Sequence, residues 1–451
     1  MRTITASFLL SILVSTTSVF SQESSDSKVK EKTKSGWSFG AVPAIAYDSD
    51  IGFKYGGVVN FFDYGDGSVY PGYKQSIYLE WSRTTKGSGI NQFTYDSKYL
   101  IPGIRTSAEV SYLTEKALDF YGFNGYESYY NPDFEDDELP GDIYRSRLFY
   151  RNDRSLLRIR ADFQGPIIKN KLNWFAGFAH YGNRIDTVDI TALNEGKNEN
   201  EKLPPINGGL YGSYVQWGLL PSDQVDGGNT NLIKAGLVYD TRDNEPNPMR
   251  GIWTELQFLM APSFLGNGDL SYTRMALTHR QYFTIIPKTV NFAYRLSYQA
   301  KLSGNMPFYM LPFVFNTAPQ KTQNGLGGAK TIRGILRNRV VGEDFIYGNL
   351  ELRWKVWRTV ILNQNFYIAL AGFLDGGMVT GKYELQDPDP AYADDAQAWL
   401  DLGDEESLHL SYGAGIHFAL NENFIVTVDY GLAPDPRDGK SGLYIGLDFL
   451  F

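Results

Sequence analysis

The sequence of 451 residues predicts an all-β protein, a transmembrane antiparallel β-barrel of about sixteen strands. Three observations predict this fold. Apolar residues alternate with polar or small residues along most of the chain after residue 37, which is typical of β-strands. The connections between these stretches are alternately short and long. No apolar run reaches the roughly 20 residues that a membrane-spanning helix needs, so a membrane crossing would have to use strands.

The first 36 residues are predicted to precede the barrel. Arg2 comes before the apolar stretch Phe8–Val14, and a small-residue site follows it and ends at Ser21. This order is typical of a secretory signal peptide, which we assign to residues 1–21. Residues 22–36 are rich in Ser, Lys and Glu and are expected to form a short polar linker. The barrel is therefore expected to occupy residues 37–451.

Each expected strand has one apolar face and one polar or small face, because successive side chains of a strand point to opposite sides. In the stretch from residue 345 to 355, the apolar face holds Ile346, Leu350, Leu352 and Trp354, and the polar face holds Asn349, Glu351 and Arg353. In the last stretch, one apolar face holds Leu443, Ile445, Leu447, Phe449 and Phe451. We expect the apolar faces to contact lipid, the polar faces to line the lumen, and Phe451 to lie at the barrel seam.

The lengths of the connections indicate how the barrel is oriented. The sixteen expected strands begin near residues 38, 51, 74, 89, 104, 155, 172, 232, 251, 271, 289, 344, 365, 408, 424 and 442. The long connections cover residues 115–154, 183–231, 301–343 and 378–407, and all of them follow odd-numbered strands. Short periplasmic turns and long external loops on an even number of strands are typical of outer-membrane barrels. The predicted location is therefore the bacterial outer membrane, with membrane lipid as a partner.

The composition excludes several classes of protein. Lys and Arg number 42 against 51 Asp and Glu, and this negative balance argues against a nucleic-acid partner. The absence of cysteine excludes disulfides, thiolate metal sites and a cysteine nucleophile. No Gly-x-Ser-x-Gly elbow and no metalloprotease helix motif occurs. The sequence therefore predicts neither an enzyme nor a cofactor.

Acidic and histidine side chains are the remaining candidates for metal ligands. Two groups of acidic residues fall in expected loops: Asp133, Glu135, Asp136, Asp137 and Asp142, and Asp387, Asp389, Asp394 and Asp395. Their spacing differs from that of a dedicated calcium loop, so solvated acidic loops are favoured over a calcium site. His409 and His417 are expected to point inward from one strand, too far apart to share a metal ion. No metal site is predicted.

Four motifs lie in the second half of the chain. They are Val238–Asn244, followed by two prolines and Gly251; Gly327–Ile335, with the sequence GGAKTIRGI; Gly348–Arg353; and Phe373–Gly377. Asp240, Arg242 and Asp243 of the first motif are expected at the periplasmic end of a strand. At that position, a salt bridge that stabilises the turn is the favoured interpretation of these three residues. An active site is the alternative.

Together these motifs resemble the barrel of the BamA/TamA-type bacterial surface-antigen superfamily, which also includes two-partner secretion transporters. The resemblance implies a sixteen-stranded barrel whose long loop after the eleventh strand folds back into the lumen. The tip of this loop carries an arginine that meets acidic residues from the twelfth and thirteenth strands. By position, Arg333 matches the tip arginine, and Glu351 and Asp375 match the two acids. The matched loop motif comprises Gly327, Gly328, Ile332, Gly334 and Ile335.

The chain departs from the family pattern in two places. Ile335 stands where the family usually has an aromatic residue at the loop tip. Family members also normally carry periplasmic POTRA domains before the barrel, and residues 22–35 leave no room for one, so a barrel without POTRA domains is expected.

A buried arginine needs paired acceptors, and a carboxylate offers the best geometry for a guanidinium. We therefore expect Arg333, Glu351 and Asp375 to form a structural latch in the lumen, the alternative being an ordinary charged lumen lining.

Two functions follow as hypotheses. In the first, the barrel assists assembly, insertion or translocation of proteins at the outer membrane, beside other outer-membrane or periplasmic proteins. It would use a weak seam between its first and last strands, where Gly40, Pro43, Gly442 and Gly446 favour poor pairing. The alternative is a passive pore or solute channel with the loop as its constriction. An outer-membrane hydrolase has no supporting group of residues.

Overall fold

The computed structural model describes residues 32–48, 52–169, 171–317, 324–361 and 364–451. Within these residues the chain forms seventeen strand segments of one sheet, and short helices occur only in the connections. The predicted signal peptide (1–21) and residues 22–31 of the predicted linker lie outside the described residues, so these assignments stay predictions. None of the helices in the described ranges is both long and apolar enough to cross a membrane.

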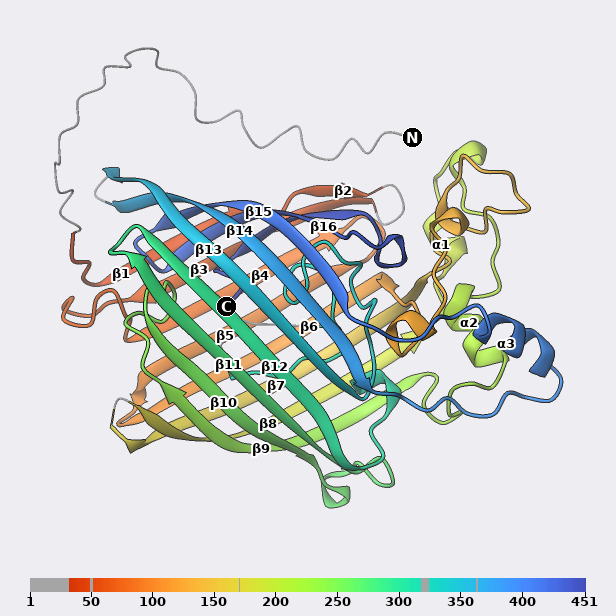
Figure 1. Cartoon of the computed structure of the whole chain (residues 1–451), viewed down its shortest axis with the longest axis horizontal. Helices are drawn as coiled ribbons and strands as arrows, with labels where there is room; N and C mark the ends of the chain where they lie inside the picture. The colour runs from red at the N-terminus through yellow and green to blue at the C-terminus, as the bar shows by residue number, and fades with distance from the viewer. Residues whose placement is uncertain (1–31, 49–51, 170, 318–323, 362–363) are drawn as a thin grey trace, which may run out of the picture.

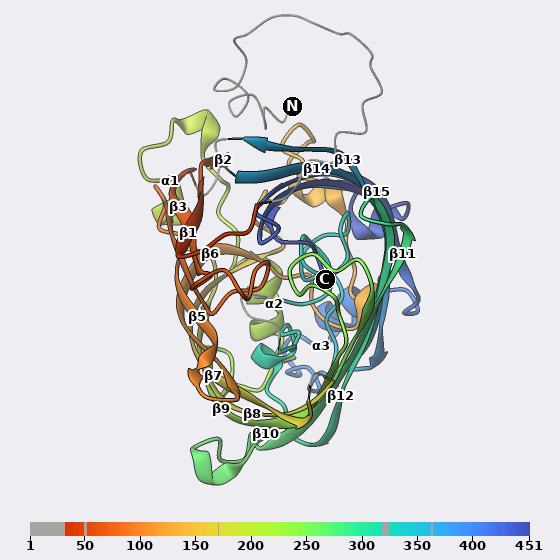
Figure 2. The ribbon, with the colours of Figure 1, turned by 90° about the vertical axis from the view of Figure 1, so that its left-hand side faces the viewer.

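The strands follow one another around the barrel in chain order (Figures 1 and 2). Their bounds are β1 Trp37–Pro43, β2 Ala46–Asp48, β3 Gly52–Asp63, β4 Gln75–Thr84, β5 Gly89–Ile101, β6 Ile104–Asp119, β7 Arg151–Ile168, β8 Leu172–Asp186, β9 Gly227–Asp240, β10 Gly251–Ala261, β11 Tyr272–Ile286, β12 Val290–Gly304, β13 Asp344–Ile361, β14 Gln364–Gly381, β15 His409–Leu420, β16 Phe424–Leu432 and β17 Ser441–Leu447. The helices are α1 Ile190–Asn194, α2 Gly209–Gln216 and α3 Ala393–Leu400.

The sheet is antiparallel throughout, and from β3 to β17 each strand pairs with the next. The short segments β1 and β2 both pair with β3 and so form one barrel strand that is interrupted at residues 44–45. The prediction of an antiparallel barrel of about sixteen strands is confirmed. Backbone pairing of this kind is required in hydrocarbon, where water cannot satisfy the N–H and C=O groups.

The predicted faces are observed in β13. Leu350, Leu352 and Trp354 are 42%, 47% and 50% exposed on the outside of the barrel. Glu351 and Arg353, at the alternate positions, are each 1% exposed inside it. The outward apolar band is the surface that a lipid bilayer covers.

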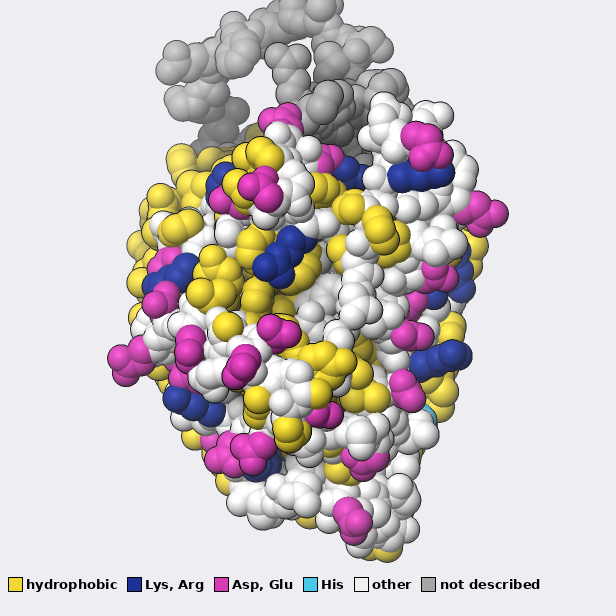
Figure 3. Space-filling view, turned by 90° about the vertical axis from the view of Figure 1, so that its right-hand side faces the viewer, with side chains coloured by type: hydrophobic (Ala, Val, Ile, Leu, Met, Phe, Trp, Pro, Cys, Tyr) yellow, Lys and Arg dark blue, Asp and Glu magenta, His cyan; other side chains and the backbone are white. Residues whose placement is uncertain are grey.

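The long connections and all three α-helices gather at one end of the barrel, and the short turns lie at the other (Figure 1). At the loop end, buried aromatic side chains from several connections pack into the largest apolar cluster, which includes Phe123, Tyr150, Tyr211, Tyr214 and Trp399. Figure 3 shows this end as a surface of packed side chains with acidic groups distributed over it. The external loops therefore pack into one apolar cluster with side chains of the barrel wall and of the connection between β12 and β13.

The last residues turn inward instead of continuing along the barrel wall. β17 ends at Leu447, and Asp448 has a left-handed backbone with a φ of 62°. Phe449 and Phe451 are 2% and 5% exposed, and the C-terminal end of the chain lies inside the ring of strands (Figure 2). The expected positions of these two residues on the lipid face and at the seam were therefore wrong. The Arg353 guanidinium lies 4.1 Å above the Phe449 ring, a contact available only inside the lumen.

Candidate functional site

The described parts of the connection between β12 and β13, residues 305–317 and 324–343, lie inside the barrel, and we call them the inner loop. Its tip, residues 327–335, is a tight hairpin closed by a bridge between Leu326 and Val340. The Gly328 nitrogen donates to the Ile335 oxygen at 2.9 Å. Gly327 has a φ of 109°, and a Cβ at this position would lie 1.9 Å from the Leu336 oxygen. Only glycine fits there, because the two arms of the tip approach so closely.

Apolar side chains fix the loop tip against the barrel wall. Ile332 and Ile335 are 0% and 1% exposed. They pack in one cluster with Phe345 and Tyr347 of β13 and Val379 of β14. Ile335, which replaces the usual aromatic residue of the family, is thus fully packed against this cluster.

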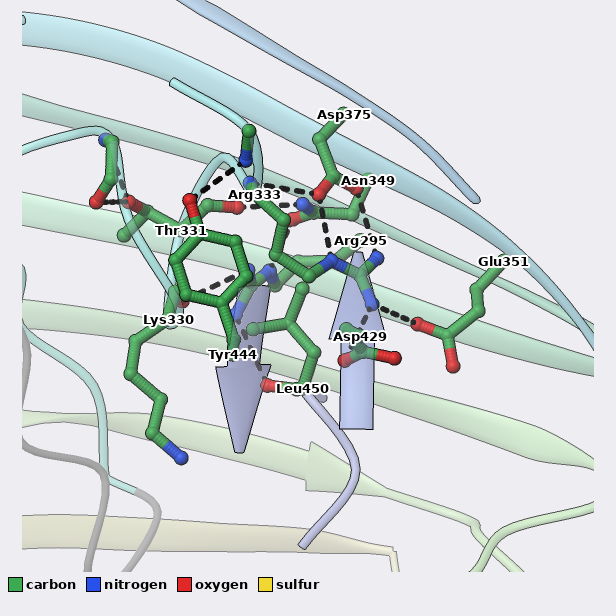
Figure 4. Close-up of polar contacts among 12 residues, drawn as sticks. Arg295, Lys330, Thr331, Arg333, Asn349, Glu351, Asp375, Asp429, Tyr444 and Leu450 are labelled. Carbon is green, nitrogen blue, oxygen red and sulfur yellow. Dashed lines mark hydrogen bonds and ion pairs between the residues drawn. The ribbon is translucent and has the colours of Figure 1, made fainter. Parts of the chain in front are cut away.

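Arg333 projects from the loop tip onto β14 (Figure 4). Its Nε and Nη2 donate to the two oxygens of Asp375 at 2.9 and 3.1 Å, and its backbone nitrogen donates to Asp375 Oδ2 at 3.1 Å. The guanidinium also lies 3.5 Å above the Phe373 ring. Arg333 and Asp375 are each 1% exposed. This two-pronged geometry is the strongest arrangement available to an arginine and a carboxylate.

Two further carboxylates share the remaining nitrogen of Arg333. Its Nη1 lies 3.3 Å from Glu351 Oε2 of β13 and 3.3 Å from Asp429 Oδ2 of β16. The structure therefore brings together all three residues matched through the resemblance and adds Asp429, which our sequence analysis missed. The signal for Asp429 was its inward position in β16, alternating with the apolar Val428 and Tyr430.

A second layer of polar contacts supports this cluster. Arg353 Nε donates to Glu351 Oε1 at 2.8 Å, and His417 Nε2 lies 2.8 Å from Asp429 Oδ1. Each of the two carboxylates thus contacts one basic side chain besides Arg333. The arrangement distributes buried charge over paired groups, which reduces the cost of removing the charges from water.

Hydrogen bonds also tie the backbone of the loop tip to β12, β13 and β17, with Arg295 Nη2 of β12 donating to the Lys330 oxygen at 3.4 Å. Asn349 of β13 donates to the Thr331 oxygen at 2.7 Å and accepts from Arg295 Nε of β12 at 2.8 Å. Tyr444 of β17 accepts from the Gly334 nitrogen at 2.9 Å. The loop tip therefore contacts the last strand of the barrel as well as its interior wall.

The strand-turn motif forms a separate site at the short-turn end. Arg242 donates from Nε and Nη2 to the two oxygens of Asp240 at 2.9 and 2.7 Å. Asp243 Oδ1 accepts from the backbone nitrogens of Asn244 and Met249 at 2.9 and 3.0 Å. Both carboxylates shape the turn between β9 and β10, and neither contacts the Arg333 cluster.

The histidines and loop acids do not assemble a metal site in the part of the chain that the structure describes. There, no group of three or more His, Cys, Asp or Glu is arranged to hold a metal ion. His409 lies between Asp438 and Glu406, with its Nδ1 2.5 Å from Asp438 Oδ1. His417 belongs to the Arg333 cluster through Asp429. The two histidines thus serve different networks.

The seam between the first and last strands is unlike the other strand boundaries. β17 pairs with residues Val426 to Leu432 of β16. Phe424, at the start of β16, therefore lies beyond the end of β17. A Cβ built on Gly40 of β1 would lie 2.3 Å from Cγ of Phe424. In the sheet order β17 lies next to β2, but among the described residues no backbone ladder joins β17 to β1. Side-chain packing therefore holds β1 against β16 at this point.

Comparison with protein-family profiles matches residues 104–449 to the Omp85 superfamily domain. The chain belongs to the Omp85 superfamily. This match confirms the resemblance drawn from the four motifs and the outer-membrane location that it implies. A comparison with curated protein sequences finds no match.

Two solved structures that are similar to this Omp85 chain are CdiB and BamA. CdiB from Escherichia coli is 11% identical, with a TM-score of 0.53, over 92% of this chain and 62% of that chain. BamA from Haemophilus ducreyi lacking POTRA domains 1–3 is 14% identical, with a TM-score of 0.48, over 91% of this chain and 69% of that chain. The Omp85 chain thus spans about two thirds of each of these structures, and the likeness to CdiB supports the fold.

Proposed function

We propose that this Omp85 barrel assists the assembly, insertion or translocation of other proteins at the outer membrane. Family membership supports the general role, and the seam is the observation that carries the proposal. β17 is only seven residues long, whereas β13 and β14 have eighteen residues each. Separating β1 from the last strands therefore disrupts far less backbone pairing than opening the barrel elsewhere.

An opened seam would expose two strand edges to a client polypeptide. Unpaired backbone groups at the edge of a sheet are a template for an added strand. On this proposal, the edge of β16 beyond Val426 and the edge of β1 receive an extended segment of the client. The clients would be other outer-membrane proteins, delivered with or without a periplasmic partner.

The inner loop would couple this opening to the lumen. Its tip is bound to β14 through Arg333 and Asp375 and to β17 through Gly334 and Tyr444. A movement of β17 would therefore break the contact between Tyr444 and Gly334, while the contact between Arg333 and Asp375 keeps the loop in place. On this proposal the Arg333 cluster is a structural latch that maintains the lumen while the seam changes.

A disulfide across the seam tests this function. The native chain contains no cysteine, so the pair Gly40→Cys and Phe424→Cys introduces the only two thiols. Cells that depend on the oxidised variant should lose particular outer-membrane proteins and recover them after reduction. The matched control is the pair Leu237→Cys and Leu256→Cys, which lie directly opposite each other on β9 and β10. An unchanged outer-membrane proteome with the seam locked would contradict the proposal.

The alternative of a passive pore predicts a steady ionic conductance for the purified protein in a planar bilayer. The described residues give that alternative no specific support, because the inner loop occupies the lumen and the external loops pack into an apolar cluster. Steady conductance together with an unchanged proteome in the locked variant would favour the pore.

A further inference from the structure

A cavity of about 670 Å³ lies inside the barrel at the short-turn end. Its lining includes Lys98, Arg105, Lys169, Lys171, Arg242 and Arg280, which are six cationic side chains. Three acidic residues, Asp240, Glu245 and Asp448, also line it. This volume is within the range of sites that bind small ligands. Cationic side chains outnumber acidic ones in the lining, so the cavity favours negatively charged groups.

Arg280 of β11 is the buried cationic group of this cavity that forms no hydrogen bond or ion pair with another described residue. It is 3% exposed, and its guanidinium lies 4.0 Å above the Trp253 ring. Its Nε has no hydrogen-bond partner, and no ion pair joins Arg280 to the residues that the structure describes. A buried N–H group without an acceptor is costly, because it loses its hydrogen bond to water.

Among the described residues, no carboxylate forms an ion pair with Arg280, although Glu255 of β10 lies near enough to attract it electrostatically. Arg295 lies directly opposite Arg280 on β12, so two like charges face each other across neighbouring strands. The nearby acid on β10, Glu255, accepts hydrogen bonds from the Thr317 nitrogen and from Gln257. Glu255 offsets part of the charge of Arg280 but does not hydrogen-bond to it, so the guanidinium keeps unused hydrogen-bonding capacity at the wall of the cavity.

The other cations of the lining fall into two groups. Arg105 pairs with Asp96 and Glu245, Lys98 pairs with Glu245, and Arg242 pairs with Asp240. Lys169 and Lys171 are exposed at the turn between β7 and β8 and form no ion pair with the described residues. An anion that enters the barrel from this side would pass these two lysines before it reaches Arg280.

We propose that this cavity is a binding site for an oxyanion, a carboxylate or phosphate group, with Arg280 as its principal contact. The planar guanidinium suits two-pronged binding of either group. Trp253, Phe449 and Phe451 also line the cavity, so the ligand would place an apolar portion against these rings. The site opens on the periplasmic side and is distinct from both the Arg333 cluster and the seam.

Binding of two small probes to the purified full-length barrel tests the site. Citrate presents carboxylates and pyrophosphate presents phosphates, so calorimetric titration with each probe distinguishes the two chemistries. Arg280→Gln should weaken binding of the preferred probe by about tenfold, which is typical of losing a charged hydrogen bond. Arg250→Gln is the matched control, because Arg250 is an exposed arginine of a neighbouring turn outside the cavity lining.

Several outcomes decide the proposal. Equal affinity of the Arg280→Gln variant and the wild type, or no binding of either probe, would overturn it. Equal weakening by Arg250→Gln would also overturn it, because it would indicate a general charge effect. If Arg280→Gln does not fold, Lys171→Gln replaces it, with an expected loss of about twofold to threefold. These measurements do not depend on client proteins, so they separate this site from the proposed function of the seam.

Discussion

Gly334 at the tip of the inner loop and Gly431 in β16 lie backbone against backbone. A Cβ built on Gly431 would lie 2.7 Å from the Gly334 nitrogen, and a Cβ built on Gly334 would lie 2.8 Å from the Leu432 nitrogen. Both distances are shorter than real Cβ atoms adopt. The absence of both side chains lets the loop tip reach the wall, and the same approach places Arg333 within reach of Asp429.

Gly431→Ala should therefore displace the loop tip. Overpacking of a tight contact typically costs about 1–3 kcal/mol, so we expect a lower thermal stability and faster protease cleavage in the inner loop. The matched control is Gly372→Ala in β14, because a Cβ at Gly372 meets no atom within 4 Å. Equal stability of the two variants would show that the tip does not depend on this close approach.

Arg333→Ala should release the inner loop from the wall. Removing one partner of a buried ion pair leaves the other charges unpaired and typically costs about 3–5 kcal/mol. Thermal unfolding in detergent and limited proteolysis would measure the effect. Arg147→Ala removes the ion pair with Asp137 in an external loop and should cost less than about 1 kcal/mol. Unaltered protease sensitivity of the inner loop would remove the latch hypothesis.

The three carboxylates around Arg333 should contribute unequally. Asp375 makes two side-chain hydrogen bonds with Arg333, whereas Asp429 makes one at 3.3 Å. Double-mutant cycles with Arg333→Ala should therefore give a larger coupling energy for Asp375→Asn than for Asp429→Asn. Similar coupling energies for the two carboxylates would mean that the cluster responds to total charge and not to hydrogen-bond geometry.

The external loop between β16 and β17 should loosen in acid. The hydrogen bond from Arg437 lowers the pKa of Asp435 below its ordinary value of 3.8. A lowered pKa in the folded state stabilises the loop above about pH 4, and this contribution is lost as the pH falls through the folded-state pKa. Hydrogen exchange of residues 433–440 between pH 5 and pH 2.5 would measure it. Asp435→Asn should remove this pH dependence, whereas Asp394→Asn in α3 should preserve it.

Most of the barrel could be predicted from the sequence, because the surroundings of a membrane-spanning strand restrict which residue types each of its two faces can carry. Lipid on one side and a polar lumen on the other impose a period of two, and this period placed Glu351 and Asp375 on the inner face. The positions of the long connections followed from the breaks in that pattern. The approach of Arg333 to these acids came from the family resemblance, since the sequence pattern alone does not say where a long loop folds.

Asp429 and the last three residues show where the pattern stops being informative. Asp429 occupies an inward-facing position of its strand, as many lumen residues do. Only the position of the loop tip makes it a partner of Arg333. Phe449 and Phe451 continue the apolar alternation of β17, yet they lie inside the barrel. Alternation with a period of two identifies the side of the sheet on which a residue lies, as long as that residue is part of the strand. It does not show where the strand ends and pairing with its neighbour stops.

The sequence by itself determined that this chain forms an antiparallel outer-membrane barrel with a lipid-facing apolar band and a charged lumen, because alternation is a local consequence of strand geometry. The tertiary structure alone decided that the inner loop meets β16 and β17, that β17 ends early, and that Arg280 faces a cavity without a hydrogen-bonded acceptor. These features depend on contacts between segments that are far apart in the chain, and no local pattern encodes those distances.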